Sequence, residues 1–247
     1  MKKKTDKEGL HKLPTSYLAR FIEFIGHVIW PRRIYGLENI DRSRPSVYTC
    51  NHGQTTGPIT AVIYLPVPFR PWVNAHMFDR ESTAKSMEKT FAKNMKFVGK
   101  KIKDRVCWWS AGIVCHIINS FEPIPVYKGH PKESEGTIEQ SVKALSQGWN
   151  MLIFPEKPKE HYNEDSYKEF NTGFAAVGRA YYESTGKCLD FYPIWTDKKT
   201  HKFIIGKPVT FNPDNDPREE KRRISETLKE RMFELKEVSR AKKKKNQ

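Results

Sequence analysis

The sequence predicts one α/β domain in which helices flank a largely parallel sheet. Short apolar runs that suit strands alternate with longer segments of helical periodicity, the pattern of a parallel sheet covered on both faces. The 247 residues suffice for a substantial core, and no internal repeat or glycine-rich linker divides them. We expect the α/β domain at residues 36–212. A basic N-terminus with an amphipathic, membrane-associating helix (1–35) precedes it, and a C-terminal amphipathic helix with a basic tail (213–247) follows it.

The composition points to an anionic partner. Lysine and arginine number 44 against 29 aspartates and glutamates, which gives a net charge of +15. Such an excess suits phospholipid headgroups, nucleic acid or a phosphorylated substrate. No recognisable nucleic-acid-binding module accompanies the charge, so a role in nucleic-acid binding rests on charge alone and is not expected. A mean hydropathy of −0.72 with 12% aromatic residues still indicates a globular protein.

The four cysteines indicate a reduced, cytoplasmic protein. They show no CxxC spacing and no paired arrangement with histidine, so we expect buried thiols, no metal site and no cofactor. The N-terminus lacks the apolar core of a secretory signal.

The segment after Ser16 suits a membrane surface better than a membrane span. Its 14 residues from Tyr17 to Trp30 would form a helix about 21 Å long, whereas a bilayer core is about 30 Å thick. Arg20 and Glu23 interrupt it, and two arginines follow it. We expect a peripheral, interfacial helix; a lid over the core is the alternative.

The rest of the chain alternates between the two-residue period of strands and the 3.6-residue period of helices. We expect strands at residues 46–50, 71–75, 122–127, 151–154, 189–195 and 202–206. We expect helices at residues 82–102, 108–118, 137–148 and 174–184, and a final one from Pro217 capped by Asp216. In the first of these helices, lysines share one face, which suits either a solvated surface or a membrane-facing one. The uncharged segment 108–118 is too short to span a bilayer and is expected to be a buried helix.

Three predicted strands end in candidate functional side chains: Asn51-His52, Tyr127-Lys128 and Pro155-Glu156. The carboxyl ends of parallel strands share one edge of a sheet, where ligands bind. Histidine, with an ordinary pKa of about 6.5, suits general-base catalysis, and a lysine suits a phosphate group. Taken singly, the histidine also fits a capping role and the lysine a solvated surface.

These strand ends belong to four blocks that resemble the glycerolipid acyltransferase family, of the 1-acylglycerol-3-phosphate acyltransferase type. The blocks are Asn51-His52, Pro123 to Lys128, Phe154-Pro155-Glu156 and Tyr192-Pro193-Ile194, and the resemblance covers residues 45 to 197. It implies transfer of an acyl chain from acyl-CoA or acyl-carrier protein to a lysophospholipid or another glycerolipid hydroxyl. The reaction would take place at the cytoplasmic surface of an anionic membrane.

The resemblance also implies roles for individual residues. His52 would be the general base that takes the proton of the acceptor hydroxyl. Lys128 stands where the family usually has a phosphate-binding arginine, and Glu156 would help to form the acceptor site. Asn51, Phe154 and Pro155 would complete the substrate-binding residues.

The sequence departs from the family pattern at the catalytic blocks. The first block usually continues to a serine and an aspartate, but here Gln54 and Gly57 stand in their places. An acid that orients a catalytic histidine is worth about 10⁴ in rate. The third block has Lys157 and Lys159 but lacks the usual arginine. The alternative is therefore a degenerate member that binds lipid or an acyl carrier without turnover. Candidates for a substitute orienting group are His76, Asp79, Asp104, Asp165 and Asp190.

Overall fold

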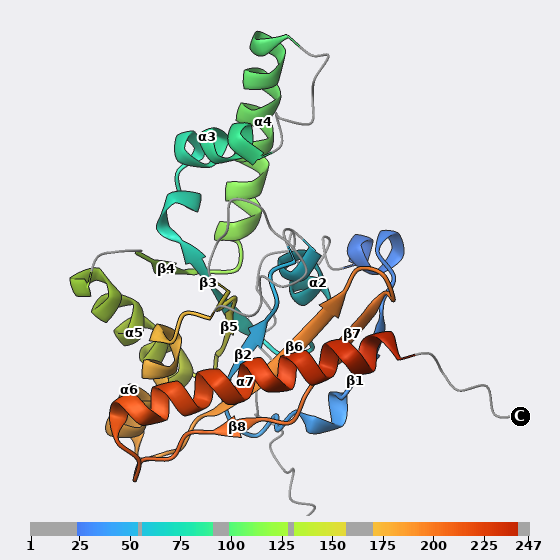
Figure 1. Cartoon of the computed structure of the whole chain (residues 1–247). Helices are drawn as coiled ribbons and strands as arrows, with labels where there is room; N and C mark the ends of the chain where they lie inside the picture. Colours follow the sequence, from blue (N-terminus) through green and yellow to red (C-terminus); the bar gives the residue numbers. More distant parts are fainter. Residues whose placement is uncertain (1–23, 54–55, 91–98, 128–130, 157–169, 242–247) are drawn as a thin grey trace, which may run out of the picture.

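The computed structural model describes residues 24–53, 56–90, 99–127, 131–156 and 170–241 (Figure 1). The strands are β1 (Arg33–Tyr35), β2 (Ser46–Cys50), β3 (Phe69–Asn74), β4 (Ile124–Val126), β5 (Asn150–Ile153), β6 (Asp190–Asp197), β7 (Lys202–Ile205) and β8 (Val209–Thr210). The helices are α2 (Thr56–Tyr64), α3 (Arg80–Thr90), α4 (Lys100–Asn119), α5 (Pro131–Ser146), α6 (Ala176–Thr185) and α7 (Pro217–Arg240). Short 3-10 turns lie at Leu37–Asn39, Ala75–Met77 and Gly173–Ala175, and residues 24–29 are helical.

One mixed sheet organises the domain. Its strand order is β1-β7-β6-β2-β5-β3-β4, and β8 pairs with the other part of β6. β2 lies between β5 and β6 and is parallel to both; β3 is parallel to β5 and β4. β7 and β8 run antiparallel to β6. The predicted α/β class with a largely parallel sheet and flanking helices is thus confirmed.

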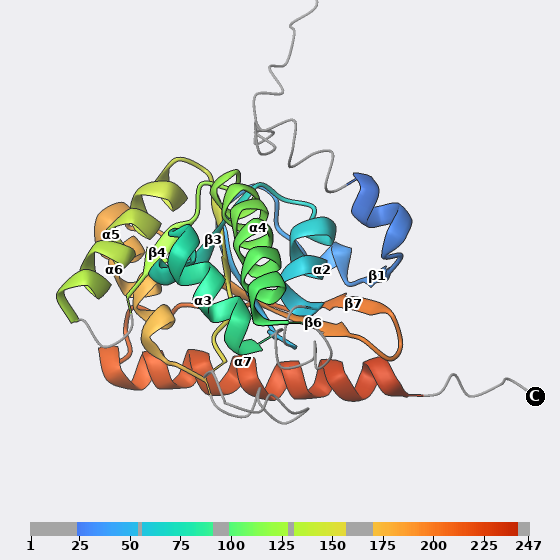
Figure 2. The same cartoon turned by 90° about the horizontal axis from the view of Figure 1, so that it is seen from above.

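Alternate residues of the strands point into two hydrophobic cores on opposite faces of the sheet. Val47, Met151 and Phe191 point to the face covered by α5, α6 and α7. Tyr48 and Leu152 point to the face covered by α2. All five side chains are almost fully buried. Figure 2 shows α7 along one side of the molecule and α2 on another. β2 is buried at every position, as expected for a central parallel strand.

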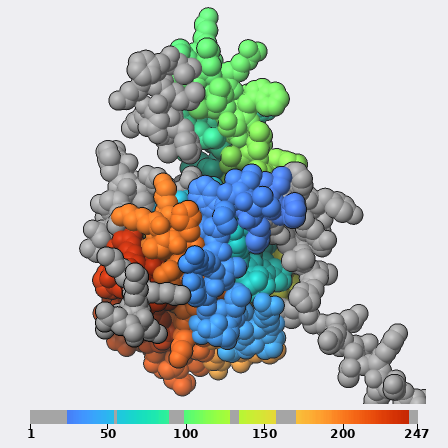
Figure 3. All heavy atoms as spheres, turned by 90° about the vertical axis from the view of Figure 1, so that its right-hand side faces the viewer, coloured from blue at the N-terminus to red at the C-terminus, as the bar shows by residue number. Residues whose placement is uncertain are grey.

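Helices α3 and α4 form an arm that extends away from the sheet (Figures 1 and 3). α4 packs chiefly on α3, through the small buried side chains Cys107, Ala111 and Cys115. Cys115 donates to the hydroxyl oxygen of Thr83, with 3.4 Å between sulfur and oxygen. Arg80 holds the two helices together because its side chain donates to the backbone oxygen of Trp108 at 3.0 Å and lies over the Trp108 ring.

The arm corrects two predictions. A single helix over residues 82–102 is wrong, because Gly99 is extended and α4 begins after it. A buried helix at residues 108–118 is wrong in its burial: Trp109 is 68% exposed and Ile113 57% exposed. The segment is apolar as predicted, but among the described residues no other element covers its exposed face.

Helix α7 fastens the end of β6. Its N-cap is Asp216, whose side chain accepts from the backbone N–H groups of Arg218 and Glu219, as the sequence predicts. At its other end, Ser239 donates to Asp197 at 2.8 Å and Arg240 donates to the same carboxylate at 3.0 Å.

Part of the predicted interfacial helix lies outside the described residues. Only residues 24–30 of the predicted interfacial helix are described, and 24–29 are helical; they contact α2 through Gly26 and a ring contact between His27 and Tyr64. Within the described ranges, every helix is too short or too polar to cross a bilayer.

Three of the four free cysteines are buried, and Cys188 is half-buried.

Candidate functional site

The candidate site lies at the carboxyl edge of the sheet, where β2 and β5 end. The parallel register pairs Thr49 with Ile153. Continued for three residues, the same register brings His52 opposite Glu156, and the backbone N–H of His52 faces the Glu156 carboxyl group. The His52 side chain is exposed, and the edge of one ring meets the face of the other between His52 and Phe154, with 5.5 Å between centroids. The structure therefore brings together the first-block histidine and the third-block carboxyl group.

Asn51 holds the end of β2 to β6. Its side-chain oxygen accepts from the backbone N–H of Thr196 at 2.7 Å and from the Thr196 hydroxyl at 3.2 Å, while its nitrogen donates to the Thr196 carbonyl at 3.0 Å. The side chain is 5% exposed. Asn51 thus fixes the backbone from which His52 projects. Its predicted part in substrate binding stays a prediction.

Gly57 closes the turn that carries His52. Its backbone N–H donates to the His52 carbonyl at 3.0 Å, and a Cβ at position 57 would lie 1.9 Å from the carbonyl oxygen of Asn51. Such a distance is far inside van der Waals contact, so no side chain fits here without moving the backbone. The constraint is close approach, since Gly57 does not have a positive φ. An aspartate therefore cannot replace Gly57 on this backbone to orient His52.

Glu156 is a buried carboxyl group without the usual partners. Burial raises its pKa to about 7, and the backbone N–H of His52 offsets only part of this rise. In the described part of the chain, neither carboxylate oxygen makes a hydrogen bond of standard geometry. A buried polar group left in this state is costly, and such groups are concentrated at functional sites. Near neutral pH, Glu156 can therefore donate a proton or accept one.

The other predicted site residues surround this pair unevenly. Phe154 is half-buried beside His52, and Pro155 is buried, with its carbonyl accepting from Asn171 at 2.8 Å. Lys128 lies outside the described residues. It follows Tyr127 at the end of β4, which β3 separates from β5.

The candidate orienting groups differ in position. Asp190 pairs with Ser46 at the opposite end of β2 and bonds to Arg44 and Thr210, which excludes it. Asp79 caps α3 by accepting from Ser82 at 2.8 Å, and Asp104 lies on the projecting α4. Asp165 lies outside the described residues. His76 is exposed in the turn after β3.

The described residues also show what the site does not contain. No three histidine, cysteine, aspartate or glutamate side chains in the described ranges gather as metal ligands. The sequence signal that locates the site is the pair of strand ends. The hydrogen bonds between Asn51 and Thr196 join residues 145 positions apart, and no local sequence pattern predicts them.

No family model matches the sequence, and no curated protein matches it. Among solved structures, the chain is similar to the 1-acyl-sn-glycerophosphate (LPA) acyltransferase PlsC from Thermotoga maritima. The sequence identity is 14% and the TM-score 0.47, over 89% of this chain and 80% of that one. A similarity of this extent identifies no function.

Proposed function

We propose that the chain is a membrane-peripheral acyltransferase. It moves an acyl chain from acyl-CoA or acyl-carrier protein to the hydroxyl group of a lysophospholipid or glycerophosphate at a cytoplasmic membrane surface. The observation that carries the proposal is the pair at the sheet edge: His52, whose side chain is exposed, and the buried carboxyl group of Glu156, which faces the backbone N–H of His52 and has a pKa of about 7. The order of the four sequence blocks supports the same activity.

In this mechanism His52 acts as the general base. It takes the proton of the acceptor hydroxyl as that oxygen attacks the thioester carbonyl carbon. The tetrahedral intermediate then collapses, the carbon–sulfur bond breaks, and the imidazolium returns the proton to the departing thiolate. Asn51 positions the backbone of His52, and the edge contact with Phe154 restricts the imidazole ring.

Glu156 positions the acceptor in this proposal. Its ionised form accepts a hydrogen bond from an acceptor hydroxyl, and its protonated form donates one to a phosphate oxygen. Either contact would satisfy oxygens that make no standard hydrogen bond in the described chain. Lys128 would bind the phosphate group, and Pro155 would shape the same wall. The segment from Ser16 to Trp30 would attach the chain to the surface of the anionic membrane.

A degenerate relative that binds lipid or an acyl carrier without turnover is the second candidate. The observation that favours it is Gly57, since the backbone there excludes the aspartate that the family uses to orient its histidine. An active enzyme must orient His52 in another way, through the Phe154 contact or the neighbouring Glu156.

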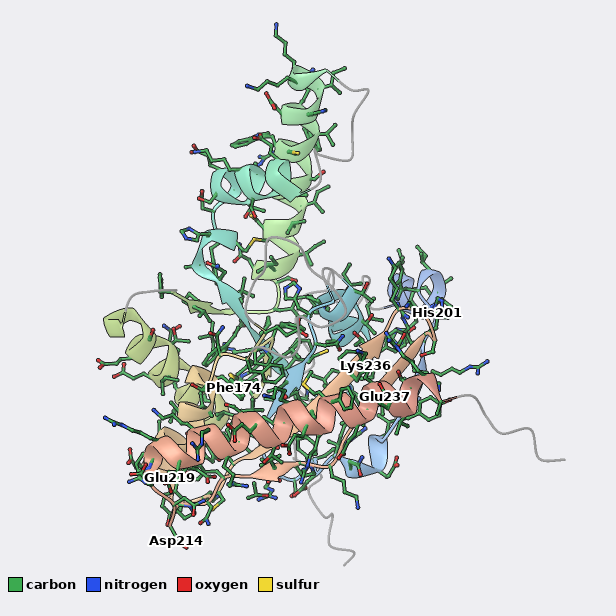
Figure 4. All side chains as sticks on the ribbon, in the orientation of Figure 1. Phe174, His201, Asp214, Glu219, Lys236 and Glu237 are labelled. Carbon is green, nitrogen blue, oxygen red and sulfur yellow. The ribbon has the colours of Figure 1, made fainter. Side chains whose placement is uncertain are left out.

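Acyl transfer by the purified full chain tests the proposal. We expect transfer from acyl-CoA or acyl-carrier protein to lysophosphatidate, and a loss of about 10²–10⁴-fold in His52→Ala. The matched control is His201→Asn, an exposed histidine at the right of Figure 4 whose positive φ asparagine tolerates. Undiminished transfer by a folded His52→Ala protein would contradict the assignment. Binding of lysophosphatidate without transfer by the wild type would select the second candidate.

The acceptor can be tested separately at Lys128. Lys128→Ala should weaken binding of lysophosphatidate by about tenfold or more, through loss of a charge-assisted contact, and should leave binding of monoacylglycerol unchanged. Lys187→Ala, an exposed lysine elsewhere, is the control. Equal losses for both lipids would make Lys128 a structural residue.

A further inference from the structure

Helix α4 carries an exposed apolar stripe made of Ile102, Val106, Trp109 and Ile113. These side chains are 59%, 42%, 68% and 57% exposed. At 100° per residue, their spacing places all four within an arc of about 60° on one face of the helix. The buried residues that pack on α3 lie on the opposite face. Aromatic and large aliphatic side chains gathered and exposed in this way mark an interaction surface.

Cations flank the stripe on both sides. With Ile102 as zero, Lys101 and Lys103 lie at about −100° and +100°, and Arg105 lies at about −60°. Lysine and arginine stems so placed can lie along an apolar surface while their charges reach polar groups beside it. The partner must therefore combine an apolar interior with an anionic surface.

The start of α4 adds to this requirement. Lys100, Lys101 and Lys103 occupy its first turn, which contains no acidic residue, and its N-cap Gly99 supplies no side-chain hydrogen bond. Cations at this end oppose the helix dipole, so an external anion would relieve the repulsion.

The shape of the molecule favours a planar partner. The arm extends beyond the body, and the first residues of α4, green in Figure 1, lie farthest from the sheet. Figure 3 shows the same protrusion from the side. A second copy meeting this arm would bring like charges together, whereas an anionic bilayer presents complementary charge.

We propose that the α4 stripe inserts into the interface of an anionic bilayer, as a membrane contact separate from the predicted N-terminal helix. The stripe enters among the acyl chains near the headgroups, and Lys101, Lys103 and Arg105 bind the lipid phosphates. Membrane binding through α4 does not depend on catalysis at His52, so measurements of membrane binding alone test it.

Co-sedimentation of the full chain with vesicles tests the proposal. We expect binding to vesicles of phosphatidylcholine mixed with phosphatidylglycerol, and weaker binding to phosphatidylcholine alone. The double variant Trp109→Ser with Ile113→Ser should bind the mixed vesicles at least about tenfold more weakly. The matched control is Phe233→Ser with Val238→Ser, two exposed apolar residues on α7, which should bind as the wild type does. Thermal unfolding should be nearly unchanged in both, because these side chains are exposed.

Charge and insertion can be measured independently. Lys101→Glu with Lys103→Glu should reduce binding to the mixed vesicles, while Lys187→Glu with Lys207→Glu should reduce it much less. Brominated lipids should quench the tryptophan fluorescence of the wild type more than that of Trp109→Phe at equal binding.

Three results would overturn the proposal. The first is equal vesicle binding by the stripe variants and the wild type. The second is quenching that does not depend on Trp109. The third is a dimer in solution that the stripe variants abolish, which would make the surface a self-association site. Failure of acyl transfer with intact, stripe-dependent binding would sink only the proposed activity.

Discussion

Two buried carboxyl groups flank the end of β2, and they are in opposite states. Asp197 ends β6 on one side, and Glu156 follows β5 on the other. The Asp197 carboxylate accepts hydrogen bonds from Ser239, Arg240 and the backbone N–H groups of Lys199 and Thr200. Glu156 makes none of standard geometry within the described chain.

Their pKa values follow from this difference. Burial alone would raise the pKa of Asp197, but the hydrogen bonds, first among them the one from Arg240, outweigh burial and hold the pKa at about 2. For Glu156, burial dominates and raises the pKa to about 7. Asp197 therefore fastens α7 to the sheet, and Glu156 remains available to a ligand. Burial alone does not distinguish a structural carboxylate from a functional one; its partners do.

Removing the satisfied carboxylate should have the largest effect on stability. Asp197→Ala removes the acceptor that Arg240 and three other donors share and should lower the free energy of unfolding by about 3–5 kcal/mol at pH 7. Because its folded pKa is lowered, the ionised carboxylate stabilises the fold above pH 4, and this contribution is lost as the pH falls from about 4 to about 2. The difference from the wild type should shrink over that window.

Denaturant unfolding at pH 7 checks this prediction. Asp214→Ala, an exposed aspartate near the start of α7 (Figure 4), is the control and should change the free energy by less than about 0.5 kcal/mol. Equal effects of the two substitutions would mean that Asp197 does not fasten α7.

Neutralising the unpartnered carboxyl group should have the opposite sign. The folded pKa of Glu156 is raised above its ordinary 4.5, so the unfolded state ionises first and the wild type loses stability as the pH rises from about 4.5 to about 7. At about 1.4 kcal/mol per pH unit, the loss reaches about 3 kcal/mol. Glu156→Gln should therefore match the wild type at pH 4 and exceed it by up to about 3 kcal/mol at pH 8.

Unfolding free energies across this pH range provide the measurement. Glu237→Gln, an exposed glutamate on α7, should be indistinguishable from the wild type at both ends of the range. A Glu156→Gln variant that is less stable than the wild type at pH 8 would show that the ionised carboxylate has partners.

The turn that faces Glu156 should tolerate no side chain at position 57. Gly57→Ala forces the backbone apart, because its Cβ would overlap the Asn51 carbonyl, and should cost about 1–3 kcal/mol. Gly136→Ala in α5 is the matched control: its Cβ meets nothing within 4 Å, and it should stabilise the helix by about 0.5–1 kcal/mol. Thermal unfolding of both variants checks the comparison, and a Gly57→Ala protein as stable as the wild type would refute the close approach.

The sequence predicts most of the sheet because strand signals are local. β2 begins and ends where its β-branched and aromatic run predicts, and Gly186 ends α6 in the left-handed conformation expected of a C-cap glycine. The short β1 and β8 carry no such signal. α5 begins at Pro131, six residues before the predicted start of this helix at Thr137.

What the sequence could not predict depends on pairing between distant segments. The register that places His52 opposite Glu156 follows from parallel strands, so the sequence can predict this pairing. The Asn51 contact with Thr196 and the approach of Gly57 to Asn51 arise only when the strands assemble. Apolar composition likewise does not reveal that the apolar face of α4 is exposed, since periodicity shows which face is apolar and not what meets it.

The titration of Glu156 tests most directly whether this edge of the sheet holds an available carboxyl group. Carbon-13 NMR of glutamate carboxyl groups, with Glu156→Gln used to assign the resonance, follows its ionisation in the folded, ligand-free chain. We expect a midpoint near pH 7. A midpoint at or below about 4.5, the ordinary value, would mean that Glu156 is solvated or paired as Asp197 is, and would contradict the distinction between the two carboxyl groups.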